Sequence, residues 1–490
     1  MKKPEFDLLI KNVRVVRPHG NVVFEADIAV KDGKIALVAP GIDVTRAKDL
    51  YDGKNKLAFP GVVDAHMHSG IYSPLEEDAV SESRAAAMGG VTSSLNYFRT
   101  GQYYMNKGGP YKKFYPEVLK TAKNRFHVDY GFHLAPMDST HIKEIPELIE
   151  KFGVPSFKIF MFYGSHGLHG ASDAQRDFLM IGKGEKYDYA HFEFIMRGIQ
   201  AAREQMPKLA NQISLSLHCE TAEIMTAYTK IVEKDKSLSG LAAYSASRPQ
   251  HSEGLAVFIA SYLAHETALP NINLLHLSSR KAVQAAMMMA ETFPHINFRR
   301  EVTIGHLMLD ITSKAAELAK VNPPIRPRED VEFLWDALLA GELDWVVSDH
   351  ACCRHEMKIP KRYFGNIWMA KSGFGGSEYL LPALVSEGTR RGMGYNHMAR
   401  VLSWNPAERY GLNSKGDIAP GFDADIALVD PSHTWTINAK DSPSTQGYTP
   451  FEGMELSASV DATFLRGNLI FENGEVIGKP RGQYLFRPTA

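Results

Sequence analysis

Cysteine is scarce in this chain, and its charges cancel. Only three of the 490 residues are cysteines (Cys219, Cys352 and Cys353), too few for a disulfide framework, so we expect a protein of the reducing cytoplasm. The 55 basic and 56 acidic residues leave a formal net charge of −1. That balance gives no reason to expect nucleic acid or an acidic membrane surface as a partner.

Long apolar runs are missing as well. No run approaches the ~18 residues needed to cross a bilayer. The opening residues MKKPEFDLLIKNVRVV are basic, but charged and polar residues interrupt the next stretch, so no signal peptide is expected. With 44% hydrophobic and 23% charged residues, the composition is that of a folded globular protein. The length suits one large α/β barrel with an appendage.

Both ends of the chain carry short segments that alternate apolar and polar residues. Residues 1–58 contain DLLIKNVRVV and DIAVKDGKIALVAP, and residues 414–490 contain DADIALVD and ASVDATFLRGNLIFENGEVIG. The pairs Asp32-Gly33 and Asn473-Gly474 are typical of hairpin turns. Each end is too small for a core of its own, so we predict that the two ends share one small β-sandwich domain.

Between these ends, residues 59–413 alternate short apolar strands with helical stretches. Helical patterns fall in most of the gaps, for example at 143–152, 193–206, 279–293 and 328–341. This alternation predicts an α/β fold, a (β/α)8 TIM-type barrel. The expected strands cover residues 59–65, 91–96, 128–135, 155–162, 212–218, 272–277, 297–302 and 343–348.

Possible metal ligands stand at the ends of several predicted strands. His66 and His68 close the first strand, and residues two apart in a strand point the same way, so both imidazoles can face one ion. His218 ends the fifth strand, His276 the sixth, and Asp349 follows the eighth. Any one of them is also compatible with a packed core residue. Because barrel active sites lie at the carboxyl ends of the strands, the set predicts a site for zinc or a similar divalent ion.

Lys158 lies in PSFKIFMF, a strand that is otherwise apolar. Burial disfavours a charged amine, so we expect its pKa to be lowered toward that of a reactive neutral amine. The alternative is a structural lysine whose ammonium reaches a carboxylate or solvent at the end of the strand.

An ordered set of motifs carries a family resemblance. FPGVVDAHMH, SFKIFMFY, LHCET, LLHLSS, NPPIR and VSDH are followed by NPAERYGL, KGDIAPGFDADIALVD and TPFEGMEL. Together they resemble the cyclic amidohydrolases, the group of hydantoinase/dihydropyrimidinase, allantoinase and dihydroorotase, over nearly the whole chain. The resemblance implies a metal-dependent hydrolase that cleaves a C–N bond of a small cyclic amide, imide or ureide, assembled as a homotetramer or homodimer.

The resemblance also implies a binuclear metal centre, with zinc as the expected metal. A lysine carbamylated by CO2 would bridge the two ions, which explains a lysine in an apolar strand. The implied ligands are His66, His68 and Asp349 for one ion, His218 and His276 for the other, and the carbamate of Lys158 between them.

Three residues receive catalytic or substrate-binding roles by the same resemblance. Asp349 would take the proton of the attacking hydroxide and return it to the leaving nitrogen. Tyr163, five residues after the lysine, would hold the developing oxyanion, although an aromatic rim residue is the alternative. Asn322, in KVNPPIRP, would contact the substrate, although it is also typical of a turn before prolines.

Two positions depart from the subfamily patterns and bear on substrate binding. Gly70 stands where dihydroorotases carry Arg, dihydropyrimidinases tend to carry Asp and allantoinases Asn. Phe374 stands where hydantoinases place an Asn that contacts the ring amide. The loops near the expected mouth are rich in aromatic residues, Tyr72, Tyr104 and Phe162 among them. We therefore expect a substrate with a bulky or aromatic substituent.

Other functions are compatible with parts of this pattern. An allantoinase-like ureide hydrolase, or a hydrolase of linear amides and ureas, would use the same ligands. A mononuclear deaminase on the same barrel would need no lysine in the fourth strand. A non-catalytic scaffold is disfavoured, because all six expected ligand positions are intact.

Overall fold

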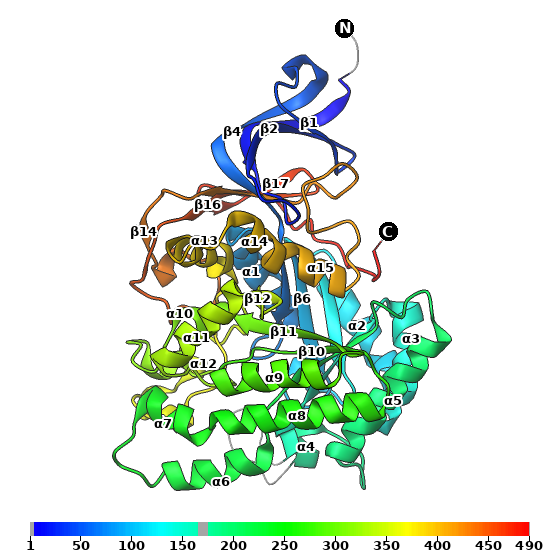
Figure 1. Ribbon diagram of the computed structural model, residues 1–490, viewed down its shortest axis with the longest axis vertical. Helices are drawn as coiled ribbons and strands as arrows, with labels where there is room; N and C mark the ends of the chain where they lie inside the picture. Colours follow the sequence, from blue (N-terminus) through cyan, green and yellow to red (C-terminus); the bar gives the residue numbers. More distant parts are fainter. Residues whose placement is uncertain (1–3, 165–174, 490) are drawn as a thin grey trace.

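The two ends of the chain meet in one eight-stranded sheet (Figure 1). In the computed structural model, which describes residues 4–164 and 175–489, its strands follow the order β18-β17-β16-β13-β4-β1-β2-β3. The strands are β1 Phe6–Val15, β2 Phe24–Lys31, β3 Lys34–Ala39, β4 Ala47–Pro60, β13 Ile426–Asp430, β16 Ser459–Leu465, β17 Asn468–Glu472 and β18 Glu475–Val476. A separate pair joins β14 Trp435–Thr436 to β15 Glu455–Leu456. Both ends of the chain thus contribute strands to one sheet, as expected of the predicted β-sandwich domain that they share.

Turn chemistry sets the hairpins of this sheet. Asp32 and Gly33, between β2 and β3, have φ values of 51° and 76°. Asn473 and Gly474, between β17 and β18, have φ values of 47° and 89°. Asn, Asp and Gly tolerate this left-handed region, and such two-residue turns match the twist of the flanking strands. Both hairpins predicted from these dipeptides are confirmed.

The middle of the chain forms the predicted barrel. Its eight parallel strands follow one another in chain order from β5 to β12. A parallel bridge between Met67 and His350 joins the first strand to the end of the last, and the His68 backbone N–H donates to the His350 carbonyl at 2.8 Å. The strands are β5 Val62–Met67, β6 Val91–Arg99, β7 Asp129–Ala135, β8 Ser156–Phe160, β9 Ser214–His218, β10 Asn271–Leu274, β11 Asn297–Thr303 and β12 Trp345–Val347.

The predicted start of the first barrel strand, at residue 59, is wrong. Residues 59 and 60 belong to β4, where they pair with β13, and the barrel begins only after Gly61. An apolar run is compatible with either sheet, because both strands are buried there, so the boundary depends on tertiary pairing.

Helices cover the outside of the barrel, with α8 and α9 running along one side (Figure 1). Local signals set several helix ends: Asp138 caps α3, Ser279 caps α9, and Gly153 closes α3 with φ 63°. The helices are α1 Leu75–Met88, α2 Tyr111–Ala122, α3 Ser139–Phe152, α4 Gln175–Leu179, α5 Tyr189–Gln205, α6 Ala222–Val232, α7 Gly240–Ser247, α8 Gln250–Glu266, α9 Arg280–Thr292, α10 Ile304–Met308, α11 Arg328–Leu339, α12 His355–Lys358, α13 Leu380–Arg390, α14 Tyr395–Ala399 and α15 Asn405–Arg409.

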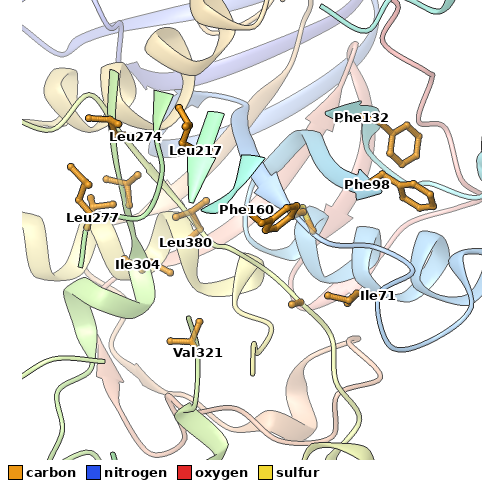
Figure 2. Close-up of a cluster of buried hydrophobic side chains, with 14 of the residues drawn as sticks. Ile71, Phe98, Phe132, Phe160, Leu217, Leu274, Leu277, Ile304, Val321 and Leu380 are labelled. Atoms are coloured by element: carbon orange, nitrogen blue, oxygen red, sulfur yellow. The ribbon is translucent and has the colours of Figure 1, made fainter. Parts of the chain in front are cut away.

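The main core joins the barrel strands to these helices. Figure 2 shows part of it, where Phe160, Leu217 and Leu274 come from β8, β9 and β10. These three side chains are at most 5% exposed. Burial on both faces explains why the barrel strands read as continuous apolar runs in the sequence.

The terminal segments attach to the amino ends of the barrel strands. The buried Lys415 ammonium lies 2.9 Å from Asp129, the first residue of β7, and 2.6 Å from Asp425. The Arg487 guanidinium donates to the Ser156 hydroxyl at the start of β8, at 2.8 Å. These contacts lie at the amino ends of the strands, opposite the carboxyl ends where the predicted ligands stand. None of the described helices combines the length and apolarity that a membrane span requires.

Candidate active site

The six predicted ligands gather at the carboxyl end of the barrel. His66 belongs to β5 and His68 follows its end, whereas His218 is the last residue of β9. His276 and Asp349 stand two residues beyond β10 and β12, in loops rather than at the last residues of strands. All six side chains, that of Lys158 from β8 included, are buried.

Short distances connect the members of this group. Nε2 of His66 lies 3.2 Å from Nε2 of His68 and 3.1 Å from Nζ of Lys158. Oδ1 of Asp349 lies 3.2 Å from the first of these nitrogens and 3.3 Å from the second. The rings of His218 and His276 are 4.3 Å apart, and those of His66 and His276 are 5.3 Å apart. The barrel thus brings all six predicted ligands into one cluster.

The backbone is constrained at two of these positions. His276 has φ 33° and Asp349 has φ 53°, in the left-handed region that residues with a Cβ rarely adopt. Such conformations persist only where surrounding contacts impose them, and they concentrate at functional sites. Both residues turn at the end of a strand, which lets their side chains face the same centre.

The chemistry of the cluster fits a divalent metal. Donor atoms of His66, His68 and Asp349 all lie within 4.8 Å of one another. Nδ1 of His276 is buried without a hydrogen-bond partner among the described residues, which is costly unless a ligand occupies it. Burial keeps the pKa of His66 and His276 well below the usual value, so both imidazoles are neutral and able to donate a lone pair. Burial opposes ionisation of Asp349, but His66 and His68 hold its pKa below the usual range.

Lys158 is the least usual member of the cluster. Burial lowers its pKa to about 7, although the negative charges of Asp349 and Glu301 act in the opposite direction. Its Nζ lies 4.0 Å from the centre of the Tyr97 ring. The predicted lowering of this pKa agrees with the structure, and a neutral amine is the form that reacts with CO2.

A cavity that is open to solvent and has a volume of about 460 Å³ lies over the cluster. Its wall includes Tyr163 and Asn322, two of the predicted catalytic or substrate-binding residues. The remainder of the described wall consists of His68, Ile71, Tyr72, Tyr104, Lys158, Phe160, Phe162, His218, His276, Val321, Asp349, Ala351, Ser372 and Gly373. Aromatic rings therefore surround the space above the ligands.

Neither Gly70 nor Phe374 is among the described residues that line the cavity. The Gly70 amide donates to Asp78 at 2.8 Å, and its φ of 85° suits glycine. The Phe374 ring packs edge-on against Phe451, with the centres 6.0 Å apart. The structure thus brings neither of these two predicted substrate contacts to the cavity, because neighbouring Ser372 and Gly373 occupy the rim in place of Phe374.

Comparison with known proteins agrees with this geometry. Residues 57–470 match the amidohydrolase family. The chain belongs to the amidohydrolase family. An allantoinase from Rubrobacter xylanophilus is 31% identical over 98% of this chain and 97% of its own. An L-hydantoinase (dihydropyrimidinase) from Arthrobacter aurescens is 27% identical with a TM-score of 0.81, over 98% of this chain and 99% of its own. A dihydropyrimidinase from Brevibacillus agri, 24% identical over 98% of each chain with a TM-score of 0.82, shares the fold.

These matches confirm the cyclic amidohydrolase resemblance and the TIM-barrel fold. The protein is therefore an enzyme, a hydrolase that acts on C–N bonds of cyclic amides. A non-catalytic scaffold is disfavoured by the same matches.

The amidohydrolase holds its histidines through residues that the sequence does not single out. Glu301 lies 2.7 Å from Nδ1 of His66, and it also accepts from the His276 backbone N–H at 3.1 Å and the Trp345 indole at 2.9 Å. A carboxylate on Nδ1 leaves Nε2 free for a metal, so Glu301 orients this ligand. Burial raises the pKa of Glu301 to about 8, whereas the hydrogen bonds from Trp345 and His276 and the charge of Lys158 favour its carboxylate form. The sequence feature that could have identified Glu301 is its position as an acidic residue inside the predicted strand 297–302.

Two more contacts act in the same way. The Tyr104 hydroxyl lies 2.5 Å from Nδ1 of His68. Glu220 lies 2.6 Å from Nε2 of His218, and the Arg248 guanidinium donates to both of its carboxylate oxygens. Three of the four histidines thus have a described oxygen partner on one nitrogen.

Proposed function

We propose that this amidohydrolase works with two divalent metal ions and opens a five- or six-membered ring amide or ureide. The observation that supports the proposal is the convergence of four imidazoles, one carboxylate and one buried lysine with a lowered pKa beneath the cavity. His66, His68 and Asp349 would hold one ion, and His218 and His276 the other. Lys158, as a carbamate, would hold both.

Zinc suits this set of nitrogen and carboxylate donors. When bound, the ions would polarise the scissile carbonyl and make water acidic enough to attack near neutral pH. Asp349 lies 3.2 Å and 3.3 Å from the two histidines of the β5 end, which supports a role for its carboxylate beside the attacking water. It takes the proton from the attacking water and delivers it to the leaving ring nitrogen.

Tyr163 and Asn322 act on the substrate from the cavity wall. The Tyr163 hydroxyl donates a hydrogen bond to the oxygen that becomes negative as the carbonyl is attacked. Asn322 carries an amide that can contact ring nitrogen or carbonyl groups, and the Tyr244 hydroxyl donates to its Oδ1. The surrounding aromatic rings exclude water from the reacting atoms.

The wall supports a ring with an apolar substituent as the substrate. Tyr72, Tyr104, Phe160 and Phe162 present mostly apolar surface to the cavity. Removing apolar surface of a ligand from water contributes about 25 cal/mol per Å². Apart from Lys158, the described residues of the wall include no lysine or arginine to pair a substrate carboxylate, so dihydroorotate is not favoured.

Allantoin is the second candidate, because the relative that is 31% identical is an allantoinase. A panel of kcat/KM values distinguishes the two. We expect an aryl-substituted hydantoin to exceed unsubstituted hydantoin, dihydrouracil and dihydroorotate. Allantoin exceeding the aryl hydantoin by a wide margin would establish the alternative, and turnover of linear amides or ureas alone would contradict ring specificity.

Two properties of the whole protein belong to the same proposal. All three cysteines are free and buried, which suits the reducing cytoplasm. Leu255, Tyr262 and Met288 expose apolar side chains on α8 and α9, which suits assembly into a dimer or tetramer. Light scattering on the purified enzyme measures the assembly, and a monomer at all concentrations would contradict it.

A further inference from the structure

Arg99 is a buried charge without a partner of opposite sign among the described residues. It is the last residue of β6, at the end of the barrel that carries the site, and it is 1% exposed. One guanidinium nitrogen, Nη1, donates to the Thr100 carbonyl at 2.9 Å. Within residues 4–164 and 175–489, Nε and Nη2 have no well-aligned hydrogen-bond partner and no carboxylate forms an ion pair with them, although the Tyr163 hydroxyl is close enough to interact with the guanidinium. An unpaired buried cation lowers the stability of the folded protein. Packing alone therefore does not explain why an arginine stands at this position.

Among the described residues, aromatic rings rather than carboxylates surround this guanidinium. Its carbon lies 5.2 Å from the ring centre of Tyr163, 5.4 Å from that of Tyr104 and 4.7 Å from that of Phe178. Cations are attracted to aromatic rings at such distances. Tyr163 and Tyr104 both belong to the cavity wall. The charge of Arg99, which is not itself among the lining residues, therefore lies beside two tyrosines of the cavity wall.

The loop that carries Tyr104 is strained in this position. Four consecutive residues, 103–106, have φ values of 64°, 47°, 71° and 51°. None of them is glycine, and for the two tyrosines and Met105 this is a region that the Cβ disfavours. This conformation places the Tyr104 hydroxyl 2.5 Å from His68 while its ring packs on Arg99. Backbone strain and a buried cation thus occur together beside the site.

We propose that Arg99 is a positioning residue for the hydrolysis: its buried charge holds the Tyr163 and Tyr104 rings in the cavity wall and strengthens the hydrogen bond that Tyr163 donates to the developing oxyanion. The inference rests on the proposed function, in which Tyr163 meets that oxyanion. A nearby cation makes a phenol a better donor, because it stabilises negative charge on the phenol oxygen. Burial raises the pKa of Tyr163, and the charge of Arg99 and its hydrogen-bond interaction with the Tyr163 hydroxyl act in the opposite direction.

A double-mutant cycle on the metal-loaded enzyme tests this role, with allantoin and phenylhydantoin as the probes. We expect Arg99→Met to lower kcat about tenfold, with KM within about twofold of wild type, since it weakens a donor that would itself contribute about 10²–10³-fold. Arg99→Lys should retain most of the rate because it keeps the charge. In a Tyr163→Phe background, Arg99→Met should have little further effect. Independent, multiplying losses or a wild-type rate in Arg99→Met would overturn the inference.

Two measurements do not depend on activity. In holoenzyme labelled with fluorotyrosine, the fluorine resonance that Tyr163→Phe removes should shift in Arg99→Met, and an unmoved resonance would overturn the inference. The melting temperature of Arg99→Met should be unchanged or higher, because an uncompensated charge has been removed. A large fall in melting temperature together with the loss of rate would show a structural role.

If the proposed function itself is wrong, the kinetics of these variants show a different pattern. Tyr163→Phe with a wild-type rate would refute the oxyanion role of Tyr163, and with it the functional half of this inference. A slow Tyr163→Phe whose loss simply multiplies with that of Arg99→Met refutes the role of Arg99 alone.

Discussion

Replacing Lys158 by methionine should stabilise the metal-free protein while it destroys the metal site. Lys158 is 1% exposed, and burial lowers its pKa from 10.5 to about 7. At ~1.36 kcal/mol per pKa unit, this difference corresponds to a cost of about 5 kcal/mol for burying the charged amine. Methionine has a similar length and no charge, so the variant avoids that cost. We expect metal-free Lys158→Met to be more stable than metal-free wild type by several kcal/mol near pH 7.

The difference in stability between metal-free wild type and Lys158→Met depends on pH. Because the pKa is lower in the folded state than in the unfolded chain, the cost is fully present below pH 7, where both states are protonated. It disappears as the pH rises from about 7 to 10.5, since the unfolded chain then also loses its proton. Metal-free wild type should therefore gain stability across this window relative to Lys158→Met.

Urea unfolding followed by circular dichroism at several pH values in that window measures the difference. Lys358→Met is a matched control: Lys358 is also buried, with a pKa lowered to about 7 by burial, but it donates to the carbonyls of Lys320 and Gly373 at 2.8 Å and 2.7 Å. When zinc is restored, only Lys158→Met should fail to bind two ions. Parallel stability curves for wild type and Lys158→Met, a less stable variant at pH 7, or full metal content in the variant would refute the reasoning.

Three further substitutions test individual residues. Glu301→Gln should weaken metal affinity about 10–100-fold in a chelator competition, because His66 loses the carboxylate that orients it, and unchanged affinity would contradict that role. Tyr163→Phe should lower kcat by about 10²–10³ in steady-state kinetics with little change in KM, and a change confined to KM would assign it to ground-state binding instead. Asp349→Asn should lose most of its turnover, because an amide cannot carry the proton to the leaving nitrogen, and a near-wild-type rate in the same assay would remove it from the mechanism.

Local periodicity is sufficient to find the candidate metal ligands. His66 and His68 are two residues apart, so they share a side of any strand, and the remaining ligands each follow an apolar run. The carboxyl ends of parallel barrel strands meet at one face whatever the details of packing. The cluster is therefore predictable before any distance between strands is known, although His276 and Asp349 lie in loops beyond those strands.

The residues around the ligands are not predictable in this way. Glu301 and Glu220 are common residue types with no distinctive spacing, and only folding shows that each carboxylate meets an imidazole. Arg99 lies just after a predicted strand, but its lack of an ion pair among the described residues is a property of its surroundings. Alignment by position places Phe374 in the site, whereas its ring packs on Phe451.

The sequence by itself thus determined the class of fold, the shared sheet of the two chain ends and the candidate ligand set, because each depends on periodicity, turn chemistry or residue type. Tertiary structure alone decided which groups orient those ligands and what forms the cavity wall. Burial, charge pairing and pKa depend on atoms brought together from distant segments, as when β5 meets β11 at His66 and Glu301, or β6 places Arg99 behind Tyr163. The chemistry of this site therefore depends on which residues become neighbours in the folded protein. Spacing along the chain does not encode these neighbours.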